Sequence, residues 1–245
     1  SDISGATSAT YDVPNITTAG TYTYRRKVTD KCGNVAYSNS HTIVVNIVPS
    51  SPADGTAGSN AWNVFAYNSS TPGTNYYGYY TQNTLDFNTD DRWSAQTAAI
   101  STGTINTTNG SGYTGCTTGA DNFSYRYKRQ GFPCGIYTIN VRHDDNLTIT
   151  KNGSTVLYNA GCCINALATG ATNVFLGPNT TLDVACVEGG GNAFTQLTFR
   201  KTGDLAITSS NAAMCHNSAA RTLTANVTGG TWSGPGVSGS SFNPA

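Results

Sequence analysis

Apolar and polar side chains alternate most clearly in the second half of the chain. Residues 137–142 follow this period of two, as expected for a half-buried β-strand whose side chains point to opposite faces in turn. Asp144-Asp145-Asn146 interrupts the alternation, and residues 147–149 resume it. Asn152-Gly153 then predicts a tight hairpin turn that leads into a strand over 155–158. The pattern indicates strands, with few signals for helices.

A second hairpin is predicted further along the chain. Residues 181–187 and 194–199 both read as strands, and they flank a loop over Glu188–Asn192 that contains three consecutive glycines. Because glycine accepts backbone conformations that other residues avoid, this loop is expected to be a permissive tip between the two strands.

Both ends of the chain carry their own period-two patterns. The first 48 residues predict strands around a turn at Asp30–Asn34, and turn formers over 50–55 resemble a linker. Near the other end, 205–208 and 221–225 are expected to be strands that stop without closing a sheet. We therefore divide the chain into 1–48, a linker over 49–60, a central domain over 61–203, and 204–245.

Composition narrows the class of protein. Charged residues are only 11% of the sequence, and the 13 basic and 13 acidic residues give a net charge of zero. A basic patch that could neutralise phosphates is missing, so nucleic acid is not expected as a partner. No apolar stretch reaches the roughly 18 residues of a membrane span, and no signal peptide opens the chain. We expect a secreted fragment, on a cell surface or extracellular, whose export signal and anchor lie elsewhere in a larger protein.

Seven cysteines support an oxidising compartment. None of them shows the CxxC spacing of a zinc or redox motif, and the three histidines are isolated, so disulfides are the preferred interpretation. The five cysteines of the central domain predict two disulfides within it. Cys162 and Cys163 are expected to have different partners, because a disulfide between neighbours needs unusual backbone geometry. The central cysteines are Cys116, Cys134, Cys162, Cys163 and Cys186.

The Asp144-Asp145 pair is the main candidate for chemistry. Neighbouring residues of a regular strand point to opposite faces, so two adjacent carboxylates converge only if the backbone is distorted between them. A bound hard cation such as Ca²⁺ would offset that distortion and the repulsion between the carboxylates. Isolated Asp-Asp pairs are common in solvated loops, so the surrounding sequence has to decide.

Hydrolytic chemistry does not suit this pair. A glycosidase needs its two carboxylates on opposite sides of the scissile bond, about 5 to 10 Å apart. The sequence also lacks the GxSxG, HExxH, Walker and Rossmann motifs. We therefore do not expect an enzyme.

The stretch GIYTINVRHDDNLTITKNGSTVLYNAGCC, followed by VFLGPNTTLDVACVEGGGNAFTQLTFRK, resembles the PA14 family. The adjacent cysteines resemble those of its flocculin and adhesin branch. The resemblance implies a PA14-like β-sandwich or barrel over most of 60–203, in which an Asp-Asp pair holds one Ca²⁺ that binds sugar hydroxyls. It implies as metal ligands Asp144, Asp145 and Asn192, and as further sugar-binding residues Gly190 and Gly191, with Glu188 in the same loop.

The two ends resemble immunoglobulin-like repeats of giant, gliding-type surface adhesins of Bacteroidetes. AGTYTYRRKVTDKCGNVAYSN is similar to the second half of such a repeat, and MCHNSAARTLTANVTGGTWSGPGVSGSSFNP to the first half. The resemblance implies an all-β chain whose central domain is flanked by partial sandwich repeats and continues into further repeats. It also implies that Cys32 and Cys215 are half-pairs. The alternative is two terminal extensions of one domain.

Several aromatic residues and one histidine have two interpretations. Trp62 and Trp93 could stack on a sugar ring, although tryptophan in a β domain is more often part of the core. The tyrosines over 76–80 fit strand packing equally well. His143, beside the Asp pair, is expected to be structural.

The preferred functional hypothesis is a surface adhesin that binds glycans on a surface or another cell through Ca²⁺ at the central domain. One alternative is a structural stalk or spacer without sugar binding. Another is an accessory carbohydrate-binding module of a larger secreted enzyme.

Overall fold

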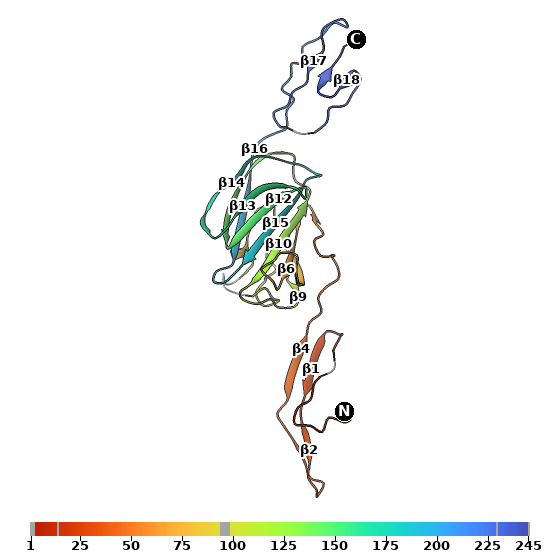
Figure 1. The fold of residues 1–245 in the computed structure, drawn as a ribbon, viewed down its shortest axis with the longest axis vertical. Helices are drawn as coiled ribbons and strands as arrows, with labels where there is room; N and C mark the ends of the chain where they lie inside the picture. The colour runs from red at the N-terminus through yellow and green to blue at the C-terminus, as the bar shows by residue number, and fades with distance from the viewer. Residues whose placement is uncertain (1–2, 14, 94–98, 229, 245) are drawn as a thin grey trace.

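The computed structural model describes residues 3–13, 15–93, 99–228 and 230–244. Figure 1 shows three parts in a row: a long N-terminal hairpin, a central domain of two packed sheets, and a small C-terminal segment. The hairpin and the C-terminal segment leave the central domain at opposite ends. The described secondary structure consists of strands and one short 3₁₀ helix, so the predicted all-β class is confirmed.

The N-terminal part is one long, interrupted hairpin. Its outer pair joins β1 (Gly20–Tyr24) to β4 (His41–Val45), and its inner pair joins β2 (Lys27–Thr29) to β3 (Val35–Tyr37). The predicted turn over Asp30–Asn34 closes the hairpin, with the amide of Gly33 donating to the carbonyl of Asp30. A second layer is absent from the described residues of this part, so they do not form a sandwich.

The C-terminal part has little regular structure. A small sheet joins β17 (Arg221–Thr222), β19 (Ser241–Phe242) and β18 (Val237–Ser238). The strands predicted over 205–208 and 221–225 are reduced to a bridge between Ile207 and Ala225 and a few flanking hydrogen bonds, such as that from the Thr208 amide to the carbonyl of Thr224 at 2.7 Å. Ile207 remains 67% exposed, so packing does not extend these strands further.

The central domain has a larger sheet whose main order is β13-β12-β15-β10-β6-β7-β9, with β5 parallel to β10 at one end. Its strands are β5 (Gly58–Ser59), β6 (Trp62–Tyr67), β7 (Tyr76–Gln82), β9 (Thr114–Gly115), β10 (Phe123–Gln130), β12 (Asn146–Lys151), β13 (Thr155–Ala160) and β15 (Thr181–Glu188).

A smaller sheet covers it in the order β14-β11-β16-β8. Its members are β8 (Phe87–Asn88), β11 (Gly135–Asp144), β14 (Ile164–Leu176) and β16 (Phe194–Gly203), and the 3₁₀ helix η1 (Thr89–Asp91) follows β8. Buried side chains from both sheets form one core, and the two sheets remain separate, so the domain is an open sandwich rather than a closed barrel.

The aromatic residues considered as sugar platforms belong to this core. Trp62 is fully buried and Trp93 is 3% exposed, so neither indole can stack on a ligand in solvent. The tyrosines of the 76–80 run lie in β7, where Tyr80 is buried in the core and the other three are half-buried. The strand-packing interpretation is therefore confirmed.

The two hairpin predictions had different outcomes. Asn152 and Gly153 connect β12 and β13 with φ angles of 52° and 77°, which fit a type I′ turn, so the first hairpin is confirmed. The second prediction is wrong, because β15 belongs to the larger sheet and β16 to the smaller one. Alternating strands joined by a short loop look the same in sequence whether the loop turns within one sheet or crosses to the facing sheet.

Part of the linker-like segment contacts the central domain. The phenol of the fully buried Tyr67 donates to Asp54 Oδ1 at 2.5 Å, and Gly58 pairs with Arg129 of β10. These contacts fix the chain before the first long strand of the sandwich. In the part of the chain that the structure describes, no helix is long and apolar enough to cross a membrane.

Candidate functional site

The candidate site lies where the chain crosses twice between the two sheets. The first crossing, at Asp144-Asp145, connects β11 to β12, and the second, over 189–193, connects β15 to β16. Asp144 pairs with Phe194 in the smaller sheet, and Asn146 pairs with Val187 in the larger sheet. The two crossings therefore lie next to each other at one edge of the sandwich.

Asp145 is held by backbone groups on both of its sides. Its amide donates to the carbonyl of Val187 at 3.1 Å, and its Oδ2 accepts a hydrogen bond from the amide of Gly189 at 2.7 Å. The peptide bond between Asp144 and Asp145 is cis. The carboxylate of Asp145 thereby fixes the start of the glycine-rich loop.

His143 supports the Asp144-Asp145 corner, where the chain first crosses between the sheets, from the interior of the domain. It is 1% exposed, and its Nδ1 lies 2.7 Å from the carbonyl oxygen of Asp145, while its Nε2 lies 2.8 Å from the Tyr158 hydroxyl. Burial lowers the pKa of His143. A neutral ring that donates from Nδ1 to the carbonyl must accept from Tyr158 at Nε2. Both nitrogens face protein groups, so the expected structural role fits these contacts.

Asp144 meets sulfur instead of a hydrogen-bond donor. Its Oδ1 lies 2.7 Å from Cys163 Sγ and 3.4 Å from Cys162 Sγ. Cys162 and Cys163 are joined by a disulfide, and disulfide sulfurs carry no proton to donate. Burial, together with hydrogen bonding and repulsion from Asp145, raises the pKa of Asp144 to about 6. Asp144 is half-buried, and no basic side chain or backbone amide contacts its carboxylate in the described hydrogen bonds and ion pairs.

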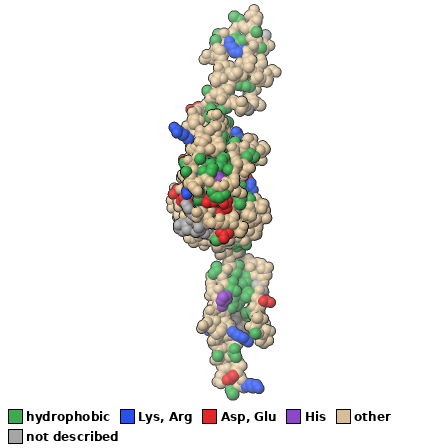
Figure 2. Space-filling model, turned by 60° about the vertical axis from the view of Figure 1, so that its left-hand side comes forward, with side chains coloured by type: hydrophobic (Ala, Val, Ile, Leu, Met, Phe, Trp, Pro, Cys, Tyr) green, Lys and Arg blue, Asp and Glu red, His purple; other side chains and the backbone are tan. Residues whose placement is uncertain are grey.

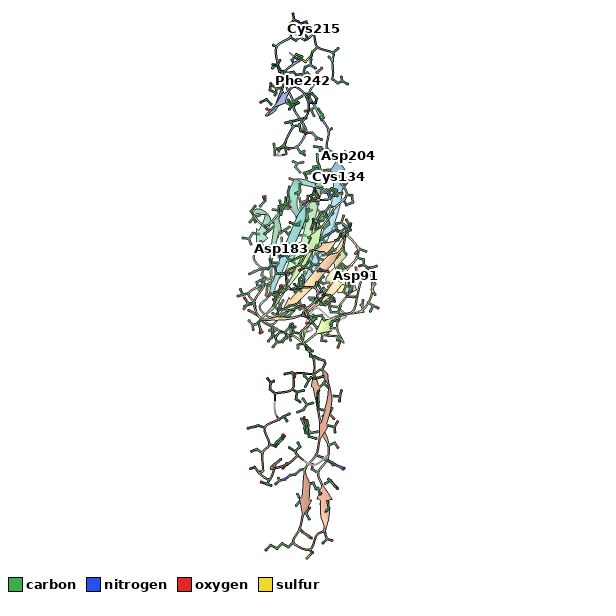
Figure 3. All side chains as sticks on the ribbon, turned by 90° about the vertical axis from the view of Figure 1, so that its right-hand side faces the viewer. Asp91, Cys134, Asp183, Asp204, Cys215 and Phe242 are labelled. Atoms are coloured by element: carbon green, nitrogen blue, oxygen red, sulfur yellow. A yellow bond between two sulfur atoms is a disulfide. The ribbon has the colours of Figure 1, made fainter. Side chains whose placement is uncertain are left out.

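The disulfide corrects the prediction that Cys162 and Cys163 have different partners. The Cα atoms of the two neighbours lie 3.1 Å apart, and the other five cysteines are free. Cys186 faces the core, and Cys116 lies near the carbonyl of Asn46. Figure 3 places Cys134 at the end of the central domain that faces the C-terminal segment, and Cys215 inside that segment. The two expected disulfides among the central cysteines are therefore not formed.

Glu188, the last residue of β15, adds a third carboxylate to the corner. It follows Leu182, Val184 and Cys186 on the buried face of the strand and is itself 0% exposed. Neither carboxylate oxygen makes a well-formed hydrogen bond among the described residues, although the Gly190 amide lies close enough to lower the pKa of the group. Burial, followed by repulsion from Asp145 and Asp144, raises the pKa of Glu188 to about 7.

A fourth carboxylate, Asp121, reaches the glycine-rich loop from another strand. Phe123 of β10 pairs with Glu188 of β15, which brings the residues before β10 beside the loop. Asp121 Oδ1 accepts a hydrogen bond from the amide of Gly191 at 3.4 Å. The sequence offered no signal for Asp121, because only sheet pairing brings it near residues about 70 positions later.

The structure brings together only part of the predicted ligand set. Asp144 and Asp145 share one corner, and the loop with Gly190, Gly191 and Asn192 follows directly after it. The described hydrogen bond between the loop and the aspartates is made by Gly189, whereas Asn192 is exposed. Figure 2 shows Asp and Glu side chains gathered on one face of the central domain, with Lys and Arg toward its edges.

This arrangement suits a hard cation. Ligand atoms of Asp144, Asp145, Cys162 and Cys163 all lie within 4.8 Å of one another. In the disulfide form the sulfurs offer no thiolate, so the available charge is on oxygen, which Ca²⁺ and Mg²⁺ prefer. No basic side chain is paired with Asp144, Asp145 or Glu188 among the described ion pairs, so a cation would reduce the repulsion among these carboxylates.

The chain is therefore an all-β protein whose central domain is an open sandwich. An acidic site lies where the chain crosses twice between the two sheets. No family model matches the chain, and no curated protein matches it. Among solved structures, it is similar to a PA14 sugar-binding domain from an RTX adhesin, at 14% identity and a TM-score of 0.46, covering 59% of this chain and 91% of that one. It is also similar to a PA14 domain of the MpAFP antifreeze protein, at 13% identity and a TM-score of 0.42, covering 61% and 88%.

Proposed function

We propose that the central domain is a PA14-like carbohydrate-binding domain whose Asp144-Asp145 corner holds Ca²⁺. The observation that carries the proposal is the contact set of Asp144, whose Oδ1 faces two disulfide sulfurs that cannot donate a hydrogen bond. A bound cation supplies the missing compensation for this carboxylate and for its neighbour.

The proposed metal ligands are Asp144, Asp145 and Asn192, and backbone groups of Gly190 and Gly191 face the sugar. Support comes from the loop geometry, because the hydrogen bond between Gly189 and Asp145 Oδ2 places the start of the loop against the pair. Gly191 has a φ of 101°, in the region that favours glycine. Ca²⁺ has a large, flexible oxygen shell, so two neighbouring sugar hydroxyls can replace water in it.

The direct test is binding to a glycan array in Ca²⁺ and in chelator. Asp144→Asn and Asp145→Asn keep nearly the same shape but remove a charge, so each is expected to lower Ca²⁺ affinity and glycan retention together by at least about tenfold. Asp91→Asn is the matched control, since Asp91 is an exposed carboxylate in η1. Glycan binding that persists unchanged in chelator would contradict the calcium-bridged mechanism.

We further propose that the chain belongs to a secreted surface adhesin, with 1–48 and 204–245 as partial immunoglobulin-like spacers around a 61–203 domain and 49–60 as their linker. Exposed apolar side chains in the hairpin, such as Val28 at 53% and Tyr37 at 52%, are what an incomplete sandwich would leave uncovered. Limited proteolysis is expected to remove both ends and leave a compact central core. A well-occupied Ca²⁺ site without any retained glycan would favour the spacer alternative.

A further inference from the structure

The candidate site carries more negative charge than one divalent ion can neutralise. Asp144 and Asp145 form the corner, Glu188 lies behind it, and Asp121 lies over the adjoining loop. One Ca²⁺ compensates two of these four carboxylates. The negative charge of the remaining two carboxylates repels an anionic group that approaches the ion.

Glu188 contributes a buried carboxylate with no basic partner among the described ion pairs, although the Gly190 amide favours its charged form. Its side chain is 0% exposed, and neither oxygen makes a well-formed hydrogen bond among the described residues. Because water is excluded around it, its field is screened less than that of a surface carboxylate.

Asp121 contributes a charge on the solvent side. It is exposed, and the Gly191 amide holds its Oδ1 against the loop where a ligand would enter. The site is thus acidic both behind the ion and beside the approach to it.

Neighbouring basic residues have acidic partners of their own. Arg142, two residues before the pair, contacts Asp90 Oδ2 at 2.6 Å and the carbonyl of Asn165 at 3.1 Å. On the larger sheet, Arg126 and Lys128 both contact Asp183. Neither group is placed to receive an anion at the corner.

We propose that the site selects uncharged sugars and rejects sugars that carry a carboxylate or a sulfate near the ion. This inference rests on the proposed calcium-dependent carbohydrate binding and names the substrate class of that site. A neutral sugar offers hydroxyls to the ion without adding charge, whereas an anionic sugar brings its charge close to Glu188 and Asp121.

The test uses matched sugar pairs. Immobilised mannose, galactose and glucose are compared with mannuronate, galacturonate and glucuronate, which keep the ring hydroxyls at C2, C3 and C4 and replace the C6 alcohol by a carboxylate. In Ca²⁺ and low salt, we expect at least one hexose to be retained about tenfold more strongly than its uronate. The difference should shrink as ionic strength rises, because salt screens the repulsion.

Two variants assign the selectivity to the named residues. Asp121→Asn keeps an oxygen for the Gly191 amide but removes the charge, and Glu188→Gln removes the buried charge. Each is expected to narrow the hexose-to-uronate ratio by about threefold, while Asp91→Asn leaves it unchanged. If Glu188→Gln fails to fold, the exposed Asp121→Asn still decides the outcome.

The two levels of the hypothesis fail in different ways. Equal, chelator-sensitive retention of a hexose and its uronate would overturn the selectivity and leave calcium-dependent binding in place. Retention of neither sugar class in Ca²⁺ would overturn the proposed function, and the selectivity with it. A ratio that neither salt nor Asp121→Asn changes would also overturn the electrostatic explanation.

Discussion

The amide of Gly189 donates a hydrogen bond of 2.7 Å to Oδ2 of Asp145, a residue 44 positions earlier in the chain. This contact joins the two crossings between the sheets, because Asp145 belongs to the first and Gly189 to the second. It orients one carboxylate of the candidate cation site through a loop that has little side-chain bulk. The geometry of the loop and the affinity of the corner for an ion are therefore expected to be coupled.

A first prediction tests this coupling with two adjacent glycines. A Cβ at position 189 would lie 3.1 Å from Asp145 Oδ2, whereas a Cβ at position 190 would lie 3.8 Å from the nearest Asp121 oxygen. Gly189→Ala should therefore displace the carboxylate and weaken Ca²⁺ binding by about three- to tenfold. Gly190→Ala, which makes only ordinary contacts, should stay close to the wild type. Isothermal titration with Ca²⁺ measures both, and equal affinities would show that the loop does not position Asp145.

The second prediction concerns the pH dependence of stability in the metal-free protein. The pKa of Asp144 is raised to about 6 and that of Glu188 to about 7, above their ordinary values of 3.8 and 4.5. Below about pH 3 both groups are largely protonated in the folded and unfolded states, so their contribution to stability is complete. As pH rises toward 7 and beyond, the unfolded chain loses these protons first, and the folded state is destabilised.

We therefore expect the free energy of unfolding in chelator to fall by about 1 to 3 kcal/mol between pH 5 and pH 8 because of these two groups. Urea unfolding at both pH values measures this change. Glu188→Gln should have a smaller pH dependence, and Ca²⁺ at pH 8 should restore the lost stability. If Glu188→Gln kept the pH dependence of the wild type, groups other than Glu188 would be responsible for the change in stability.

Local features of the fold could be predicted because they depend on neighbouring residues. The alternation over 137–142 lies in β11, and Asn152-Gly153 forms the turn between β12 and β13 because both residues accept positive φ. The break at Asp144-Asp145 was visible because it interrupts a regular period. It marks the place where the chain leaves one sheet for the other.

Features that depend on which sheet a strand joins could not be predicted. Strands β15 and β16 alternate as a hairpin would, yet each pairs with a different sheet. Asp121 reaches the site only because β10 pairs with β15 in a register that sets Phe123 opposite Glu188. Glu188 appeared to be a loop residue, whereas it continues the buried face of β15.

The third prediction distinguishes the cysteines by their reactivity. Cys134 is exposed and should be alkylated in the native protein, while Cys162 and Cys163 should react only after reduction. Cys186 is 1% exposed, and burial raises the pKa of its thiol to about 12, so it should react only after unfolding. Peptide mapping should find residues 162 and 163 in one unreduced peptide, lighter by two hydrogens. A cross-link from either residue to another cysteine would contradict the structure.

The last prediction concerns Trp62, which packs between the two sheets. Its ring lies 5.4 Å from that of Phe87 and 6.0 Å from that of Phe199, both in the smaller sheet, and its indole N–H donates to the carbonyl of Leu85 at 3.1 Å. Trp62→Ala should leave a cavity at the centre of the core and cost about 3–5 kcal/mol of unfolding free energy.

Circular dichroism during urea unfolding measures this loss without relying on tryptophan emission. Trp62→Phe should cost less, because it retains an aromatic ring in the cavity. Trp232→Ala should leave the stability of the central domain unchanged, since Trp232 lies in the C-terminal segment. A role of Trp62 in stacking on sugar would give the opposite result, with glycan retention lost and stability kept. Its complete burial leads us to expect lost stability, while the Ca²⁺ affinity of the protein that remains folded stays close to that of the wild type.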